Sequence, residues 1–225
     1  MAKGERLPKK ETDNKNEASA RAEESKNRIL LAAADIFSRK GLDGARVDEI
    51  AAAARINKRM IYHYFESKEN LYVEVLRYNY RKIYNLAKGA FIPGADPMEN
   101  VERALRQYFY FLARDEEFVR LVNWEALNRG RYGSRVLPQL LDLFESDLGQ
   151  ILQDGINRGV FRPDLDIRQT LLSMHALCLI YFSRRETVQP MWAGDMMSED
   201  MLEERCRHIL DFTFNGILKN KEEIE

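Results

Sequence analysis

A chain of 225 residues, 45% of them hydrophobic and 32% charged, is long enough to bury a sizeable core and is not a disordered protein. Its longest apolar run, ALCLIYF, is far shorter than the roughly 20 residues of a membrane span, so the sequence predicts a cytoplasmic protein. Two cysteines, Cys178 and Cys206, fit a reducing compartment better than a disulfide framework.

The formal net charge of −1 hides an uneven distribution along the chain. Residues 25–90 contain thirteen Lys or Arg against seven Asp or Glu, whereas residues 91–225 contain sixteen against twenty-three. This asymmetry is typical of a protein in which one part faces a polyanion and the other does not. Charged side chains that face only solvent would give similar counts, so the charge distribution alone does not establish binding to a polyanion.

The first predicted element is a helix that starts near Ser25. Residues 1–24 lack apolar periodicity and are predicted to form a mobile arm that becomes helical near its end. Apolar residues then repeat at helical spacing from 29 to 37, and Gly41 after two basic residues predicts the end of the helix.

Two short helices are predicted next, over Val47–Ala54 and Lys58–Tyr64, with Asn57 as the N-cap of the second. Ile61 and Phe65 form an i, i+4 pair that can anchor the second helix in a small core. The opposite face carries cations and polar rings: Lys58, Arg59, Tyr62 and His63.

The rest of the chain is also predicted to be helical. Ser67 caps a fourth helix that runs over about 67–88 and ends before the PGADP break. Further helices are expected over 97–113, 115–129, 135–158, 165–186 and 199–220. The predicted fold class is therefore all-α, with residues 25–70 as a small N-terminal domain, 71–225 as a helical bundle, and the fourth helix connecting them.

Two short helices joined by a tight turn, the second exposing cations, are the pattern of a helix-turn-helix that places its second helix in the major groove. The stretch VDEIAAAARINKRMIYHYFESKENLY, residues 47–72, also resembles the DNA-binding signature of TetR/AcrR-type transcriptional regulators. The resemblance runs without gaps from about Ile29 to Leu76. Beyond it, the chain resembles that family only in being helical.

The resemblance implies that the helix over 58–64 is the recognition helix, that Tyr62 and Tyr64 contact phosphates, and that Lys68 holds a phosphate at a helix N-terminus. Base contacts are assigned to Lys58, Arg59 and His63. The predicted DNA-binding residues are Arg46, Val47, Asp48, Asn57, Lys58, Arg59, Tyr62, His63, Tyr64 and Lys68.

Two residues depart from the family pattern. Arg46 stands where a Ser or Thr usually caps the second helix, so that cap is expected to be lost. Arg55 stands where the turn usually has Gly, and a left-handed conformation there would cost roughly 1 to 2 kcal/mol.

Polar residues interrupt an apolar face formed by Phe118, Leu121, Glu125 and Asn128 at helical spacing. A buried Glu125 needs a partner, which can be a backbone group, an Arg or a ligand. The predicted ligand-binding residues are Tyr108, Phe111, Phe118, Leu121, Trp124, Glu125, Asn128, Phe144, Met174, His175 and Cys178.

No cofactor motif is present, and metal binding is not expected. His175 and Cys178 lie one helical turn apart, but nothing completes a ligand set, and Cys206 and His208 cannot face the same way on one helix. A Cys178 nucleophile also lacks an orienting group, so we do not expect an enzyme.

The last two long helices are apolar on more than one face, which predicts a homodimer built as a four-helix interface. The interface is assigned to Leu171, Leu179, Phe182, Leu210, Phe214 and Ile217. Two-fold symmetry then predicts an inverted-repeat operator.

Together these features predict a transcriptional regulator, most simply a repressor, released from double-stranded DNA by a small molecule of unidentified structure. By resemblance, the ligand would shift the fourth helix and so change the spacing of the two recognition helices. One alternative is a constitutive DNA-binding regulator without an inducer. The other is an all-helical enzyme that uses His175, Cys178 or Glu125.

Overall fold

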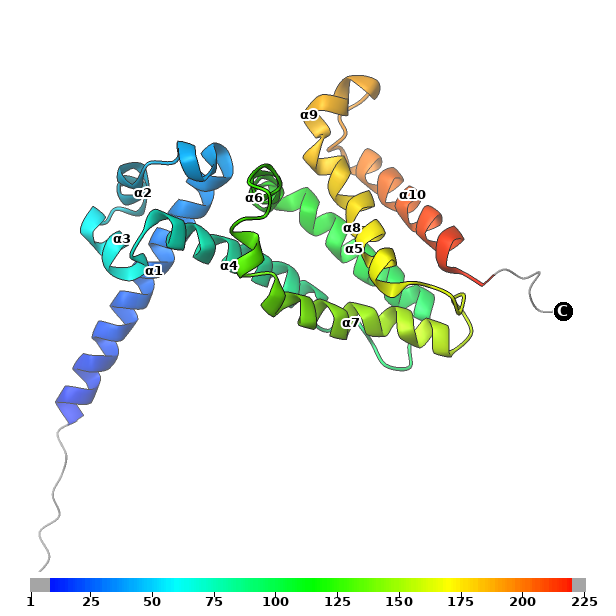
Figure 1. Cartoon of the computed structure of the whole chain (residues 1–225), viewed down its shortest axis with the longest axis horizontal. Coiled ribbons are helices and arrows are strands. Elements are labelled where there is room, and N and C mark those ends of the chain that lie inside the picture. The colour runs from blue at the N-terminus through cyan, green and yellow to red at the C-terminus, as the bar shows by residue number, and fades with distance from the viewer. Residues whose placement is uncertain (1–8, 220–225) are drawn as a thin grey trace, which may run out of the picture. The chain divides into compact units, whose positions relative to one another are not determined.

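The computed structural model describes residues 9–219, with side chains described for 19–138 and 147–219. Within residues 9–219 every regular element is helical, apart from one isolated β-bridge between Phe161 and Leu218 (Figure 1). The all-α prediction is confirmed. The chain divides into two compact units, Met1–Val75 and Leu76–Glu225. The division falls inside a helix, a few residues after the 70/71 boundary that the sequence suggested.

The first unit contains α1 (Lys9–Gly44), α2 (Val47–Ala54), α3 (Lys58–Phe65) and the start of α4 (Lys68–Ala87). Its fully buried side chains come from all four helices, among them Phe37, Ile50, Ile61 and Tyr72. The rings of Phe37 and Tyr72 meet edge to face, with centroids 5.1 Å apart. This small core fixes which face of α3 is left for solvent.

Helix α1 begins at Lys9, well before the predicted start at Ser25. Most of residues 9–24 are strong helix formers such as Glu, Lys, Ala and Arg, so a helix can continue there without an apolar face to bury. Helix was predicted only near the end of residues 1–24, whereas it extends back to Lys9, and residues 1–8 lie outside the described part. At the other end Gly41 has φ 67 and interrupts the helix where the sequence predicted a stop.

The second unit is a helical bundle that follows the predicted spans closely. Its long helices are α5 (Pro97–Arg114), α6 (Glu116–Leu127), α7 (Pro138–Asn157), α8 (Ile167–Ser183) and α10 (Glu199–Ile217). Shorter elements are η1 (Gly133–Arg135), α9 (Arg185–Val188) and η2 (Gln189–Met191). Side-chain caps at Asp96, Asp115 and Asp166 explain why α5, α6 and α8 begin where they do.

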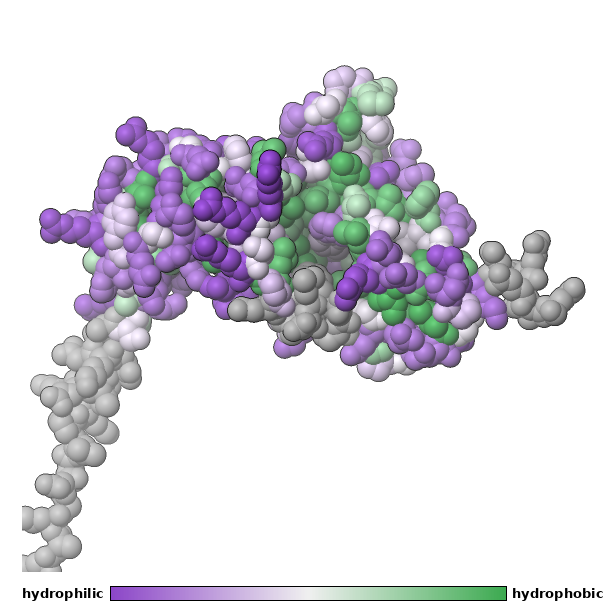
Figure 2. All heavy atoms as spheres, viewed as in Figure 1, coloured by the Kyte–Doolittle hydropathy of each residue, from purple (hydrophilic) through white to green (hydrophobic). Residues whose placement is uncertain are grey.

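Two apolar clusters hold this bundle together. One is centred on Phe109, Phe118 and Cys178, and the other on Phe161 with Ile151 and Leu152. Figure 2 shows apolar residues gathered on the visible face of the second unit, whereas hydrophilic residues cover most of the visible face of the first.

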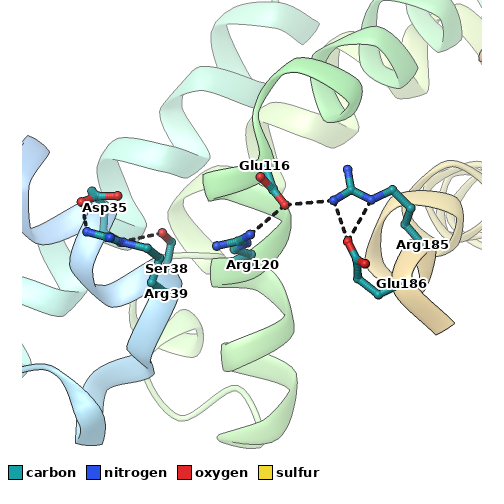
Figure 3. Close-up of polar contacts among 7 residues, drawn as sticks. All are labelled: Asp35, Ser38, Arg39, Glu116, Arg120, Arg185 and Glu186. Atoms are coloured by element: carbon teal, nitrogen blue, oxygen red, sulfur yellow. Dashed lines mark hydrogen bonds and ion pairs between the residues drawn. The ribbon is translucent and has the colours of Figure 1, made fainter. Parts of the chain in front are cut away.

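Helix α6 is tied to its neighbours at its N-terminal end. Lys82 Nζ of α4 donates to Asp115 at 2.8 Å, and although burial alone would lower it, this hydrogen bond raises the pKa of Lys82. Arg185 of α9 lies 3.3 Å from Glu116, as Figure 3 shows. These contacts fix the end of the helix that carries Glu125.

Candidate functional site

The helix-turn-helix of the first unit presents a polar face on α3. The Asn57 side chain accepts a hydrogen bond from the backbone N–H of Arg59 at 2.9 Å, which starts the helix as predicted. Ile61 is 1% exposed and anchors α3, so Arg59, Tyr62 and His63 point away from the core and are exposed. Tyr62 is 44% exposed, which is unusual for a ring that only fills a core.

The structure places the predicted DNA-binding residues on α2, α3, the turns before them and the first residue of α4. Those with exposed side chains are Arg46, Asp48, Asn57, Lys58, Arg59, Tyr62 and His63. Those with half-buried side chains are Val47, Tyr64 and Lys68.

Two of the acidic residues of α2 are paired with lysines. Lys58 Nζ lies 2.9 Å from Asp48, and this hydrogen bond raises the pKa of Lys58. Lys40 of α1 donates to both carboxylate oxygens of Glu49 at 2.9 Å. In contrast, the Arg59 side chain forms no hydrogen bond or ion pair with any described residue, so its charge is available to a partner.

Lys68 and Tyr64 also have neighbours that the sequence did not reveal. Lys68 Nζ donates to the carbonyl oxygen of Ala45 at 3.2 Å, and Ser67 caps α4 by accepting from the N–H of Asn70. Lys26 of α1 lies over the Tyr64 ring at 5.7 Å. An ammonium has three N–H donors, so Lys68 can keep its carbonyl contact and still reach a phosphate.

Both departures from the family pattern have the expected geometry. Arg46 stands at the N-cap of α2 with no side-chain cap, although its carbonyl oxygen accepts from Glu49 and Ile50. Arg55 adopts the left-handed conformation, with φ 53 and ψ 49. The C-terminal carbonyls of α2 are instead satisfied by Arg28 of α1, a residue that the sequence analysis did not single out.

The second unit contains a cavity of about 1040 Å³ that is partly open to solvent and is lined by α4, α5, α6, α7, α8 and the segment between α6 and α7. This is large enough for a drug-sized molecule. Predicted ligand-binding residues that line it are Tyr108, Phe118, Glu125, Met174, His175 and Cys178. Phe144 falls among the side chains that the structure does not describe.

Four predicted ligand-binding residues do not line the cavity, namely Phe111, Leu121, Trp124 and Asn128. Phe111 packs against Phe118 with ring centroids 5.4 Å apart, and Leu121 is buried elsewhere in the bundle. The sequence analysis also missed the contribution of α4, which provides Tyr80, Ile83, Leu86 and Ala87. The apolar positions of α4 were visible in the sequence, but nothing in the sequence linked them to a cavity.

Glu125 is buried, and the backbone provides its partners. Its Oε2 accepts from the N–H groups of Gly133 at 2.6 Å and Tyr132 at 3.1 Å. Its Oε1 is also buried and has no hydrogen-bond partner among the described residues. Burial and the charge of Glu125 together raise the pKa of the Tyr80 hydroxyl to about 12.

Three other titratable side chains of the cavity wall, Tyr108, His175 and Cys178, are neutral near pH 7. The Tyr108 hydroxyl lies 2.7 Å from His175 Nδ1, the two rings stack, and burial lowers the pKa of His175. Burial raises the pKa of Cys178 to about 12, which makes its thiol a weak nucleophile. No group of three or more His, Cys, Asp or Glu suited to a metal ion occurs among the described residues.

The predicted dimer residues need a partial correction. Leu210 and Ile217 are 5% and 3% exposed and belong to the protomer's own core. Leu171, Leu179, Phe182 and Phe214 are half-buried against the same clusters. The exposed apolar side chains of α8 and α10 are Leu172, Ile180 and Phe212. Helical periodicity showed two apolar faces but could not show which of them points inward.

None of the helices in the described part of the chain has both the length and the apolarity that crossing a bilayer requires.

Two family matches cover most of the described chain. Residues 29–75 match the bacterial regulatory proteins of the tetR family, and residues 97–213 match the tetracyclin repressor-like C-terminal domain. The HTH-type transcriptional repressor NicS of Pseudomonas putida is 32% identical over 202 residues, which cover 87% of this chain and 93% of that protein. The HTH-type transcriptional repressor SCO4008 of Streptomyces coelicolor is 30% identical over 195 residues, 84% of this chain and 96% of that protein.

Solved structures with the same fold include FadR from Bacillus subtilis in complex with stearoyl-CoA. The FadR chain has a TM-score of 0.68 and is 19% identical, and the match covers 84% of this protein and 98% of FadR. The ketosteroid regulator KstR2 of Mycobacterium tuberculosis has a TM-score of 0.63 and 22% identity, with 87% and 95% covered. At these identities the likeness concerns the fold alone.

Proposed function

Since the chain belongs to the TetR family of bacterial transcriptional regulators, we propose that it is a cytoplasmic, homodimeric repressor that a small molecule releases from an inverted-repeat operator. Its residues 25–70 would bind DNA, and the bundle from 71 onward would bind the small molecule and form the dimer. The observation that carries the proposal is an exposed cationic α3 in a chain that also contains a cavity of about 1040 Å³.

The polar face of α3 supports DNA binding. Arg59 is exposed with no described partner, and it lies beside the exposed Tyr62 and His63 on a helix short enough to fit a major groove. Relatives at 30% and 32% identity over most of their length carry the name transcriptional repressor, which supports repression over activation.

The cavity supports a ligand-responsive protein over a constitutive one. Helix α4 lines the cavity with Tyr80 and Ile83 and begins at Lys68, next to the α3 helix. A ligand that favours one placement of α4 would thereby change the DNA-binding half. For release from DNA, the ligand must bind the DNA-incompetent conformation more tightly than the DNA-binding one. The ratio of its affinities for these two conformations limits how far the equilibrium between them shifts.

The dimer would use the outer apolar surface of α8 and α10. Leu172, Ile180 and Phe212 are 60%, 50% and 60% exposed, although Leu172 also lines the cavity, and a second copy that covers such side chains would remove apolar surface from water. A two-fold axis between two such pairs would place two copies of α3 on successive turns of an inverted repeat.

Genomic footprinting of the purified protein, followed by fluorescence anisotropy on the fragments recovered, tests this proposal. Arg59→Ala should weaken binding and relax the preference at one operator position, because a side chain that reads a base edge is lost. Lys68→Ala should weaken binding to all sequences and lower the salt slope by about 1. Absence of any fragment bound above the level of random DNA at modest ionic strength contradicts the proposal.

A further inference from the structure

His175 interrupts the apolar surface that α8 turns toward the cavity. It lies four residues after Leu171 and three before Cys178, and all three residues line the cavity. Positions three and four residues apart share one face of a helix, so the imidazole stands on the cavity side of α8. Most other residues of the described wall are apolar, such as Ile83 on α4 and Leu105 on α5. A polar ring in such a surface can orient a ligand that apolar contacts alone would hold in several ways.

One nitrogen of this ring is held by α5. His175 Nδ1 lies 2.7 Å from the Tyr108 hydroxyl, and the two rings stack with centroids 5.7 Å apart. Burial raises the pKa of Tyr108 and lowers the pKa of His175, so both groups are uncharged near pH 7. The Tyr108 hydroxyl has no other hydrogen-bond partner among the described residues. It therefore donates to Nδ1, and the proton of the uncharged imidazole is on Nε2.

The other nitrogen is accessible. Among the described residues, His175 Nε2 has no hydrogen-bond partner, and it is not one of the buried polar atoms without a partner, a group that includes Glu125 Oε1. Since the ring is half-buried and stands on the cavity side of α8, the Nε2–H is open to a ligand. A ligand that displaces water from this N–H without accepting its hydrogen bond leaves the donor unpaired, which weakens binding.

The buried part of the described wall has no cation for an anionic ligand. The polar side chains Gln150, Gln153 and Arg168 also border the cavity, but they are exposed and so belong to its solvent-facing rim. The hydroxyl of Tyr80 keeps its proton, because burial and the charge of Glu125 raise its pKa to about 12. Moving a charged group out of water into such surroundings is costly, whereas an uncharged acceptor avoids most of that cost.

On the basis of the proposed function, we propose that the cavity takes an uncharged, mainly apolar molecule with a carbonyl oxygen that accepts a hydrogen bond from His175 Nε2–H. Tyr108 is the positioning residue, because its hydroxyl holds the ring and keeps the ring proton on Nε2. The apolar body fills the space between α4, α5 and α8, and the carbonyl oxygen determines which end of the molecule lies against His175.

Three compounds on one naphthalene body test this inference: 2-acetylnaphthalene with a neutral acceptor, 2-ethylnaphthalene without one, and 2-naphthoate as the anion. Isothermal titration, with the full-length protein injected into each compound, should show the ketone binding about ten-fold more tightly than either of the others. The hydrocarbon leaves the Nε2–H unpaired, and the carboxylate loses its hydration. Without the His175 donor the hydrocarbon would bind at least as well as the ketone, since it is the more apolar compound.

Single substitutions assign the effect to the two residues. His175→Phe keeps a ring and removes both nitrogens, so the ketone should lose its advantage over the hydrocarbon. Tyr108→Phe should reduce that advantage by about three-fold, because the ring proton is no longer kept on Nε2. Tyr110→Phe on the same helix is the matched control. Its hydroxyl donates to Glu203 and the residue does not line the cavity, so the ketone preference should be retained. Thermal unfolding checks that each variant is folded before titration.

Nitrogen-15 NMR gives a readout that requires no ligand. The chain has three histidines, so loss of one set of signals in His175→Phe identifies those of His175. At pH 7.5 to 8, roughly one unit above the ordinary histidine pKa, they should report a neutral ring with its proton on Nε2. In Tyr108→Phe they should move toward a mixture of the two tautomers, whereas Tyr110→Phe should leave them unchanged.

Four results overturn the inference: equal binding of the ketone and the hydrocarbon, tighter binding of the naphthoate than of the ketone, an intact ketone preference in His175→Phe, or no binding of the ketone at millimolar concentration. Proton occupancy of Nδ1 in the unmodified protein overturns it as well. Operator binding is measured on the same samples in a separate arm. Failure to bind any operator contradicts the proposed function but leaves the ketone preference measurable, and loss of that preference with intact operator binding contradicts this inference alone.

Discussion

Arg28 of α1 donates from Nη2 to the carbonyl oxygens of Ala54, at 2.6 Å, and Arg55, at 2.8 Å. These are carbonyls at the C-terminal end of α2, where the helix dipole is negative and backbone acceptors have no partner within the helix. One guanidinium therefore closes α2 and fixes the turn that leads into α3. This contact positions the proposed DNA-reading face without touching it.

Arg28→Ala should lower the free energy of unfolding by about 1 kcal/mol, because the part-buried carbonyl of Ala54 and the exposed carbonyl of Arg55 lose a charged donor. Urea unfolding followed by circular dichroism measures the loss. Arg39→Ala is the matched control on the same helix, because Arg39 is exposed and pairs with the exposed Asp35 one turn away (Figure 3). It should change stability by about 0.5 kcal/mol or less. Equal effects of the two variants would contradict the role of Arg28.

Arg55→Gly should raise the free energy of unfolding by about 1 kcal/mol. Arg55 has φ 53, a conformation that is strained for a residue with a β-carbon and free of strain for glycine. Ala52→Gly in the exposed interior of α2 is the control, and it should lower stability by about 1 kcal/mol. If both glycine variants lower the urea midpoint, the strain at residue 55 is compensated elsewhere in the turn.

Gly155→Ala should be among the most damaging small substitutions in the second unit. Its β-carbon would lie 2.0 Å from Cδ2 of Phe161, a ring that is 1% exposed in an apolar cluster. Relieving that overlap requires movement of the ring or of α7 and should cost about 1 to 3 kcal/mol. Gly149→Ala in the same helix meets nothing closer than 3.8 Å and should be neutral or stabilising. Similar melting temperatures for the two variants would exclude close packing of Phe161 on α7.

Stability should fall as the pH drops below about 6.5, in part because of His175. Burial lowers the pKa of His175, so in that range the unfolded chain binds a proton that the folded chain does not. Stability therefore rises with pH through this window and is lost on acidification. His175→Gln should make the free energy of unfolding less dependent on pH between about 7.5 and about 5.5. An unchanged slope in His175→Gln would contradict burial of a neutral imidazole.

The sequence predicted the elements well where local rules determine them. The bounds of α2 and α3 followed from apolar spacing and from Asn57, and the loss of the Arg46 cap was expected from residue type. A left-handed Arg55 was considered only because the family that the sequence resembles usually has Gly at that position of the turn. Helix α1 begins earlier than expected. Residues 9–24 have no apolar stripe, and they form helix because most of them have a high helix propensity.

The binding sites were harder to predict, because they depend on which face of each helix packs against which neighbouring helix. Glu125, His175 and Cys178 line the cavity as anticipated, but Trp124, one residue from Glu125, does not. Leu210 was assigned to the dimer although it lies in the core, since two apolar faces of one helix look alike in sequence. Pairing of Lys58 with Asp48 depends on how α3 packs against α2, which spacing does not reveal.

Within this pair, the Asp48 carboxylate competes with DNA phosphates for the positive charge of Lys58. Lys58 keeps N–H donors for a phosphate while it pairs with Asp48 at 2.9 Å, but the carboxylate offsets part of its charge, so an arbitrary stretch of duplex would gain less from this residue. DNA sites at which the neighbouring Arg59 also reads a base edge would bind more tightly, because the base contact adds to the weakened phosphate attraction. A single aspartate would thereby keep the repressor from being sequestered along the chromosome and leave more of it free to find its operator.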